Sequence, residues 1–218
     1  MNLVIFDCDG VLVDSEPLIN RIEAECFTQI GAPMTGEQAI TQFKGKTVEQ
    51  VANALESRIG HPLSAEFVYD WAMATAFGLT QDLHAVPGVQ DVIERVRTAG
   101  AAICVASQSP LPRVLLSLHI TGLNHYFGEN VFTASMVPNP KPAPDLFLYA
   151  AKRMGYSPQE TIVIEDSPSG VLAARAAGMR AYGYAAHEDA GALERAGARV
   201  FYSMDELHFD GGFVQDAV

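Results

Sequence analysis

The sequence predicts a doubly wound α/β protein: a mainly parallel, Rossmann-like sheet with an inserted α-helical cap domain. Three observations lead to this prediction. Several short segments are continuously apolar, helical patterns ending at glycine alternate with them, and one long stretch near the N-terminus has helical periodicity without a convincing strand. Continuous apolar strands are typical of a parallel sheet covered on both faces. Strands that alternate with helices favour the α/β class.

Six apolar segments of four to six residues are the expected strands. They are Leu3–Phe6, Ala101–Ala106, Val131–Ala134, Thr161–Ile164, Arg180–Tyr184 and Arg199–Tyr202. Helical patterns separate most of them. Pro87–Ala99, Ala143–Met154 and Val171–Ala177 each stop at a glycine, the residue that most readily adopts the left-handed conformation beyond a helix end. This repeated order predicts right-handed crossovers between parallel strands.

The stretch 16–83 breaks the alternation and is expected to form a small helical cap. Three apolar stripes at helical spacing run through it, beginning at Ile19, Val48 and Phe67. Thr35 and Thr47 each precede a glutamine by three residues, which is the spacing of a helix capping box. The predicted division is an α/β core of residues 1–15 and 84–218 and a cap of residues 16–83.

Charge and composition narrow the partners and the compartment. Net charge is −12, from 14 basic and 26 acidic residues, so we expect neither nucleic acid nor an anionic membrane as a partner. No apolar run approaches the roughly 18 residues that span a bilayer, and the N-terminus shows no secretory signal. Three cysteines without C-x-x-C spacing favour reduced thiols in the cytoplasm. We expect a monomer with a loose tail from His208 to Val218.

Polar side chains gather directly after the predicted strands. Asp7 and Asp9 follow the first strand, Ser107-Gln108-Ser109 the second and Glu165-Asp166 the fourth. Lys141 lies in the proline-rich segment PNPKPAPD, just after the third. Ligands of open α/β sheets bind outside the carboxyl ends of the strands, so we expect these residues to converge on one crevice.

The chemistry that these side chains permit is narrow. Several carboxylates in one place suit Mg²⁺, which prefers oxygen ligands, and without a cation they would repel one another. A cation and Lys141 together would hold a phosphate against the carboxylates. Phosphoryl transfer asks mainly for positioning and charge neutralisation, and an aspartate can serve as its nucleophile through an aspartyl-phosphate.

Four segments resemble the motifs of a known superfamily, in its order and at plausible spacings. FDCDGVLVDSE, ASQS, PKPAPD and VIEDSPSGVLAARAAGM are similar to the four motifs of haloacid dehalogenase-like phosphatases. The resemblance points to the branch with a helical cap inserted after the first motif. That branch includes β-phosphoglucomutase, phosphoglycolate phosphatase and sugar-phosphate phosphatases.

The resemblance implies a role for each core residue. Asp7 would be the nucleophile and Asp9 the general acid and base. Ser107 and the amide of Gln108 would hold the phosphate, and Lys141 would steady both the phosphate and the nucleophile.

The resemblance also implies a Mg²⁺ site. Its ligands would be Asp7, the backbone carbonyl of Asp9, and Asp166, with Glu165 bound directly or through water.

In the cap, the cationic turn Lys44-Gly45-Lys46 is either a plain solvated turn or a lid over the leaving group that helps to choose the substrate. We single out Lys44 and Gly45 as candidate substrate residues.

Two departures from the branch bear on function. Gln108 stands where asparagine is common, which leaves the role of its side chain open. Ile19 stands where β-phosphoglucomutase has a histidine, which favours a hydrolase over a mutase. We therefore predict a Mg²⁺-dependent phosphatase that acts on a small phosphorylated metabolite, a sugar phosphate or sugar-acid phosphate, through an aspartyl-phosphate.

Three alternatives are kept. The first is a β-phosphoglucomutase-like phosphosugar mutase. The second is a phosphonate hydrolase using Lys44 or Lys46 as a Schiff-base lysine. The third belongs to another class, a non-enzymatic receiver-type phosphoacceptor module, which would carry no inserted cap.

Overall fold

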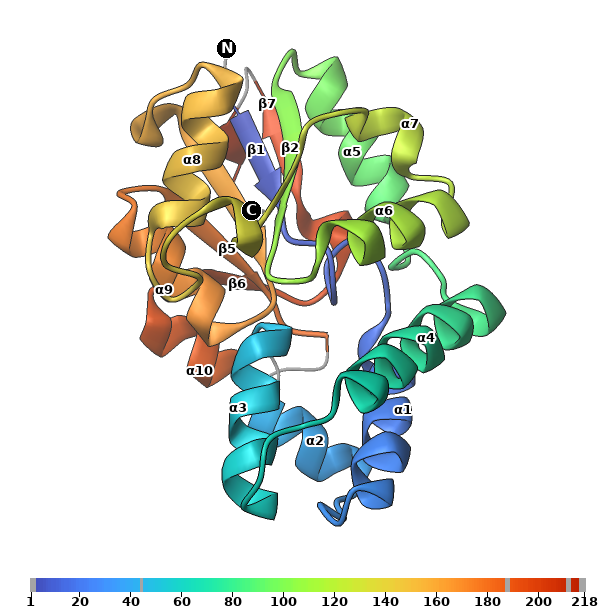
Figure 1. Cartoon of the computed structure of the whole chain (residues 1–218). Coiled ribbons are helices and arrows are strands. Elements are labelled where there is room, and N and C mark those ends of the chain that lie inside the picture. Colours follow the sequence, from blue (N-terminus) through green and yellow to red (C-terminus); the bar gives the residue numbers. More distant parts are fainter. Residues whose placement is uncertain (1–2, 44, 187–188, 211–212, 216–218) are drawn as a thin grey trace.

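The structure is a computed structural model that describes residues 3–43, 45–186, 189–210 and 213–215. Its centre is a six-stranded, all-parallel sheet in the order β3-β2-β1-β4-β5-β6 (Figure 1). The strands are β1 (Leu3–Phe6), β2 (Ala102–Ser107), β3 (Val131–Thr133), β4 (Thr161–Glu165), β5 (Arg180–Tyr184) and β6 (Arg199–Phe201). The predicted doubly wound α/β fold is confirmed.

The central strand β1 is buried on both faces, as its unbroken apolar sequence predicts. All four of its residues are fully buried, and Leu3 pairs with Ala102 of β2 on one side and with Thr161 of β4 on the other. Successive side chains of a strand point to opposite faces. Val4 and Phe6 accordingly belong to one apolar cluster, and Leu3 and Ile5 to another.

Helices cover both faces of the sheet. Residues of α5 (Val89–Thr98), α6 (Leu111–Ile120) and α7 (Asn124–Phe127) pack in the cluster of Val4. Residues of α8 (Asp145–Met154), α9 (Pro168–Ala176) and α10 (Ala190–Ala196) pack in the cluster of Leu3. Figure 1 shows the two groups on opposite sides of β1. Short 3-10 turns complete the core at η1 (Ala134–Met136), η2 (Pro158–Glu160) and η3 (Met204–Glu206).

The expected loose tail is wrong for the part of it that the structure describes. Strands β7 (His208–Asp210) and β8 (Phe213–Gln215) pair antiparallel, with Phe209 opposite Val214. In this segment the two strands therefore pair with each other, and β7 lies beside α5.

Between β1 and α5 the chain forms four helices, which we call the cap. They are α1 (Glu16–Gln29), α2 (Gly36–Phe43), α3 (Val48–Ile59) and α4 (Ala65–Asp82). The cap has its own apolar cluster, in which the rings of Phe27 and Trp71 meet edge to face at 5.1 Å. Both expected capping boxes form, at Thr35 and at Thr47.

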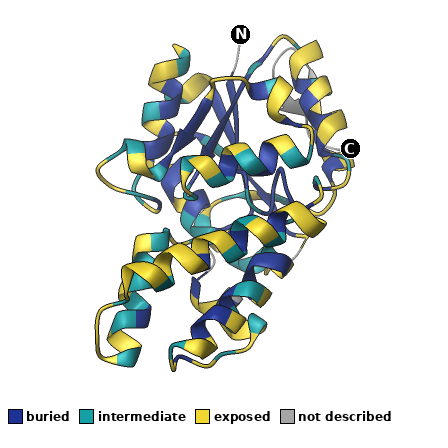
Figure 2. Ribbon diagram, turned by 45° about the vertical axis from the view of Figure 1, so that its right-hand side comes forward, coloured by how far each residue is buried: buried dark blue, intermediate teal, exposed yellow. Residues whose placement is uncertain are grey.

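The cap lies beyond the carboxyl end of β1, with its outer helix faces exposed (Figures 1 and 2). Among the described residues, no helix is both long and apolar enough to cross a membrane.

Candidate active site

The polar residues predicted from sequence meet at one cavity between the sheet and the cap. Asp7 follows β1, Ser107 ends β2, Glu165 ends β4, and Lys141 comes from the loop before α8. Because these strands are parallel neighbours, their carboxyl ends lie side by side. The cavity has a volume of about 100 Å³ and is lined by both the core and the cap.

Lys141 links the carboxylates at the base of this cavity. Its ammonium donates to Asp7 Oδ1 at 2.6 Å, to Glu165 Oε1 at 2.5 Å and to the carbonyl of Ala106 at 3.0 Å. The residue is only 2% exposed. Burial favours the neutral amine, but the carboxylates of Asp7 and Glu165 outweigh it and raise the pKa of Lys141. Lys141 is therefore a buried cation that holds Asp7 in place.

Asp7 remains in an unfavourable environment despite this partner. Burial is the largest influence on its carboxyl, and the nearby charges of Glu165 and Asp9 act in the same direction. Lys141 opposes them only in part, so the pKa of Asp7 is raised to about 7. Among the described residues, the carboxylates of the site outnumber its cations.

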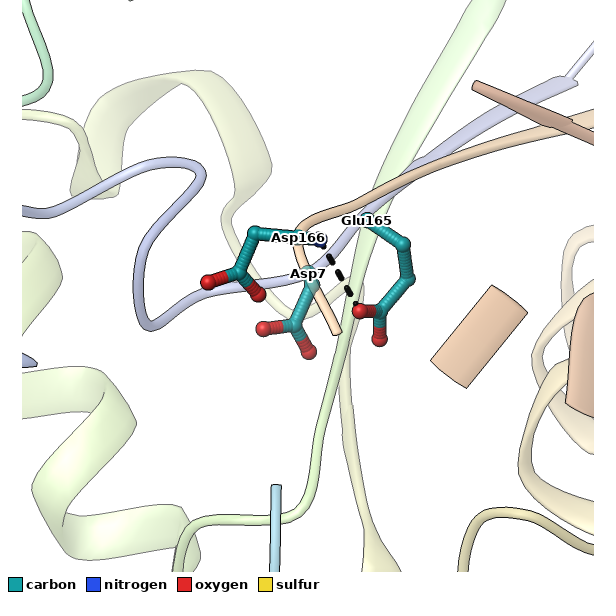
Figure 3. Close-up of side chains that lie close together, drawn as sticks. All are labelled: Asp7, Glu165 and Asp166. Atoms are coloured by element: carbon teal, nitrogen blue, oxygen red, sulfur yellow. Dashed lines mark hydrogen bonds between the residues drawn. The ribbon is translucent and has the colours of Figure 1, made fainter. Parts of the chain in front are cut away.

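The residues present fit a divalent cation. Asp7, Glu165 and Asp166 are buried and offer carboxylate oxygens that all lie within 4.8 Å of one another (Figure 3). Gly10 lies directly against this group, because a Cβ built on it would come 2.1 Å from Asp166 Oδ2. A hard cation with oxygen ligands is the chemical complement of such a cluster.

Glu165 is fixed from several sides. Its Oε2 accepts hydrogen bonds from the amides of Asp166 (3.0 Å) and Ser167 (2.9 Å) and from the Ser167 hydroxyl (2.8 Å). Its Oε1 accepts from Lys141. Both carboxylate oxygens are thus engaged by protein groups, and Ser167, not Glu165 or Asp166, caps the following helix α9.

Asp9 is held by three side chains. Oδ1 accepts from the Ser15 hydroxyl at 2.6 Å and from Arg113 Nη2 at 3.2 Å, and Oδ2 accepts from the Ser109 hydroxyl at 2.6 Å. Burial raises the pKa of this carboxyl, but Arg113 and the two hydroxyls outweigh it, so the pKa is lowered. Asp9 is consequently an oriented, ionised carboxylate.

The side chain of Gln108 joins the cap to the core. Its amide nitrogen donates to the carbonyl of Gly45 in the cap turn, and its oxygen accepts from the backbone amide of Lys141 at 3.0 Å. Gly45 has a φ of +70° and lies so close to α9 that an added Cβ would be 2.8 Å from Ser169 Oγ. Gly45 is therefore at the cavity as expected, whereas the other predicted cap residue, Lys44, lies outside the described residues.

Ser107 has a local partner as well as a place in the cavity. It is 1% exposed, and its hydroxyl accepts a hydrogen bond from the amide of Ser109 at 3.0 Å.

Sequence reasoning did not single out Ser15 or Arg113 of the Asp9 network, and it placed Ser109 at the crevice without giving it a role. Ser15 and Ser109 belong to the motif segments FDCDGVLVDSE and ASQS, so the hydroxyls in those segments were the available signal. Arg113 had none beyond being a lone cation in the apolar segment LPRVLLSL.

The fold and the site together define a class of protein: a Rossmann-like α/β protein with a carboxylate–lysine cluster at the carboxyl ends of its strands and a helical cap over it. Comparison with known proteins agrees. The profile of the haloacid dehalogenase-like hydrolases matches residues 1–178. The chain therefore belongs to the haloacid dehalogenase-like hydrolase family.

Named relatives and a solved structure extend over most of the chain. It is 30% identical to the 6-phosphogluconate phosphatase of Escherichia coli (strain K12) over 84% of this chain and 82% of that protein. It is also 30% identical to hexitol phosphatase A of the same organism over 93% of this chain and 91% of that protein. A conserved haloacid dehalogenase-like protein of unknown function from Agrobacterium tumefaciens has a TM-score of 0.77 and 34% identity, covering 94% of this chain and 95% of that one.

These similarities confirm the resemblance seen in the sequence and the prediction of an enzyme. The protein is a hydrolase of this family, its named relatives are phosphatases, and the receiver-type alternative is set aside.

Proposed function

We propose that the protein is a Mg²⁺-dependent phosphatase that hydrolyses a small phosphorylated metabolite, a sugar phosphate or sugar-acid phosphate, through an aspartyl-phosphate on Asp7. The observation that carries this proposal is the buried contact of Lys141 with Asp7 and Glu165, beside Asp166. The names of the phosphatase relatives support the substrate class.

Asp7 is suited to attack phosphorus in line. Lys141 holds its Oδ1, while among the described residues its Oδ2 has no hydrogen-bond donor. As the bond from Asp7 to phosphorus forms, the bond to the leaving oxygen breaks, and Asp9 gives that oxygen a proton. Asp9 then takes a proton from water as the water oxygen attacks phosphorus. Phosphate leaves, and Asp7 is regenerated.

Asp9 must carry a proton for the first half of this cycle and lose it for the second. The Arg113 contact and the Ser15 and Ser109 hydroxyls favour the ionised form, which matches the second half. They also fix the direction of the carboxylate, because each donor comes from a different segment of the core.

When bound, Mg²⁺ would neutralise the charge of the carboxylates and of the phosphoryl group. Asp7, Asp166 and the backbone carbonyl of Asp9 would hold it. We assign Glu165 to a contact through water, because both of its oxygens are already engaged.

The phosphate would lie between the Ser107 hydroxyl, the backbone amide of Gln108 and the ammonium of Lys141. All three residues line the cavity. Preorganised donors of this kind stabilise developing negative charge without reorganising during the reaction.

The cap is proposed to open for substrate and close for chemistry. Ligand sites usually have volumes of roughly 300–1,000 Å³, whereas this cavity holds about 100 Å³. A sugar phosphate therefore enters only if the cap (residues 16–83 in the predicted division) moves away from the core. Closure then excludes bulk water.

The monomeric state and the cytoplasmic location of the protein stay predictions.

Replacing Asp7 by asparagine tests the mechanism. We expect Asp7→Asn to lose phosphate release by a factor of at least about 10³, because the amide is a poor nucleophile. The measurement is phosphate release from a panel of phosphorylated metabolites with Mg²⁺ present. Near-normal turnover of Asp7→Asn would defeat the proposal. Isomerisation of a hexose 1-phosphate by the wild type would favour the mutase instead.

A further inference from the structure

Glu23 is a buried carboxyl group that the proposed chemistry does not use. It lies on α1 of the cap, is 7% exposed and lines the active-site cavity. Within the described part of the chain, no hydrogen-bond donor and no ion-pair partner is in contact with its carboxylate. A buried carboxylate without such partners is costly. We therefore expect a group of the bound ligand to supply the hydrogen-bond partner of Glu23.

Three apolar side chains of the cap line the cavity together with Glu23. They are Phe43, Val51 and Trp71, which are buried and belong to one apolar cluster. Asn20, three residues before Glu23 on α1, is the neighbouring polar group and is 8% exposed. A wall of this kind lowers the local dielectric, so a hydrogen bond to Glu23 would be strong and a like charge beside it would be strongly disfavoured.

Among the described residues that line the cavity, the cations other than Lys141 are Arg113, which is paired with Asp9, and Lys46, which is exposed. Arg113 is the nearby positive charge from the core; its Nη2 donates to Asp9, which itself adds negative charge, and its buried Nε has no hydrogen-bond partner among the described residues. Lys46 also lines the cavity, yet it is exposed, with its ammonium 5.6 Å from the centre of the Phe43 ring. Among the described residues, a ligand carboxylate beside Glu23 would meet the negative charges of Glu23 and Asp9, and the buried cation there, Arg113, already forms an ion pair with Asp9.

We propose that Glu23 accepts hydrogen bonds from hydroxyl groups of the leaving group, so that the enzyme selects phosphates of sugars or polyols that carry no carboxylate. This inference rests on the proposed function and narrows it by removing the sugar-acid phosphates. Hydroxyls donate to a carboxylate in short, charge-assisted bonds. The carboxylate of a sugar acid cannot donate and repels Glu23 instead. One named relative is a 6-phosphogluconate phosphatase and the other a hexitol phosphatase, so their names point to a sugar acid and to a polyol. The chain is 30% identical to both, so sequence similarity does not decide which of these two substrate classes it prefers.

Three matched substrate pairs test the inference, each differing only in a terminal CH₂OH or carboxylate. They are sorbitol 6-phosphate with 6-phosphogluconate, glycerol 3-phosphate with 3-phosphoglycerate, and 2-hydroxyethyl phosphate with phosphoglycolate. The measurement is kcat/KM for phosphate release at pH 8, where Glu23 is ionised, by the wild type, Glu23→Gln and Glu23→Asp. Glu25→Gln is the matched control, because it removes the same charge from an exposed position two residues further along α1.

We expect the wild type to prefer the alcohol by about tenfold or more in the pair whose terminal group reaches Glu23. Glu23→Gln should shrink this preference at least about fivefold, mainly by faster hydrolysis of the acid, because the repelling charge is gone. Glu23→Asp keeps the charge and should still reject the acid. Glu25→Gln should leave the ratio unchanged. Circular dichroism verifies that each variant is folded, and the isosteric glutamine keeps the shape of the site.

Absence of any alcohol preference in all three pairs, or a preference that persists in Glu23→Gln, would overturn the inference. A preference for the acids that disappears in Lys46→Ala would do so too, and would assign recognition to Lys46. Acetyl phosphate, used as a substrate, shows whether only the inference about Glu23 is wrong or the proposed function as well. Its leaving group needs no hydroxyl recognition, so turnover that depends on Asp7 would remain even if Glu23 had no role.

Discussion

Asp9 and Glu23 are buried carboxyl groups in one cavity, and their neighbours move their pKa values in opposite directions. Burial is the largest influence on both and raises both. For Asp9, the Arg113 guanidinium and two hydroxyls overcome burial and lower the pKa. For Glu23, Arg113 lowers the pKa without outweighing burial, and the charge of Asp9 adds to burial, so the pKa is raised to about 7. The contact with Arg113 thus keeps Asp9 ionised, whereas Glu23, which lacks this contact, titrates near neutrality.

The raised pKa of Glu23 makes a prediction about stability. Because the folded protein retains this proton when the unfolded chain has lost it, stability falls as pH rises from 4.5 to about 7. Glu23→Gln removes this loss, so its free energy of unfolding should exceed that of the wild type by about 1–3 kcal/mol at pH 8. The difference should shrink at pH 5. Urea unfolding at both pH values is the measurement, and an equal difference at the two would contradict the explanation.

At the scale of elements, the segments predicted best from the sequence were those with one clear pattern of apolar residues. β1 and β5 begin and end at the predicted residues, and β1 does so because it is an uninterrupted apolar run. Helix α9 begins at Pro168, three residues before the predicted start, since Ser167 caps it and proline suits its first turn. Helix α6 was not predicted, because Pro110 and Pro112 obscure its start.

Side-chain contacts between different elements could not be predicted from the sequence. The role of the Gln108 side chain depends on two backbone groups, 63 and 33 positions away along the chain, that only the closed arrangement brings together. The local periodicity and propensity of a segment do not show which residues far away along the chain it will contact. The same holds for Arg113, whose partner Asp9 is 104 positions away.

The Gln108 bridge predicts a measurable coupling between cap and core. Gln108→Asn is one methylene shorter and cannot reach both the Gly45 carbonyl and the Lys141 amide. Losing one such hydrogen bond costs about 1 kcal/mol, so we expect a several-fold loss in kcat/KM. Hydrogen exchange in the Gly45 turn should become faster in the presence of phosphate. Unchanged kinetics together with unchanged exchange would show that the bridge does not hold the cap closed.

At the scale of the whole molecule, the sequence predicted the convergence of Asp7, Lys141 and Asp166, because parallel strands bring their carboxyl ends to one edge of the sheet. It did not predict how the charges would balance there. In the part of the site that the structure describes, the carboxylates of Asp7, Asp9, Glu165 and Asp166 are accompanied by two buried or half-buried cations, Lys141 and Arg113. A divalent cation that joins the end of β1 to the end of β4 should therefore stabilise the entire core.

Magnesium binding should be visible without any substrate. At a Mg²⁺ concentration about 100 times its dissociation constant, the folded state gains about 2.7 kcal/mol. For a chain of this length that raises Tm by roughly 5–10 °C. Asp166→Asn should lose most of the rise, because it removes a charged member of the trio. Glu129→Gln, which removes an equal charge from an exposed loop, should retain it. An equal rise in both variants would mean that Mg²⁺ acts through general surface charge, and that Asp7, Glu165 and Asp166 are not its site.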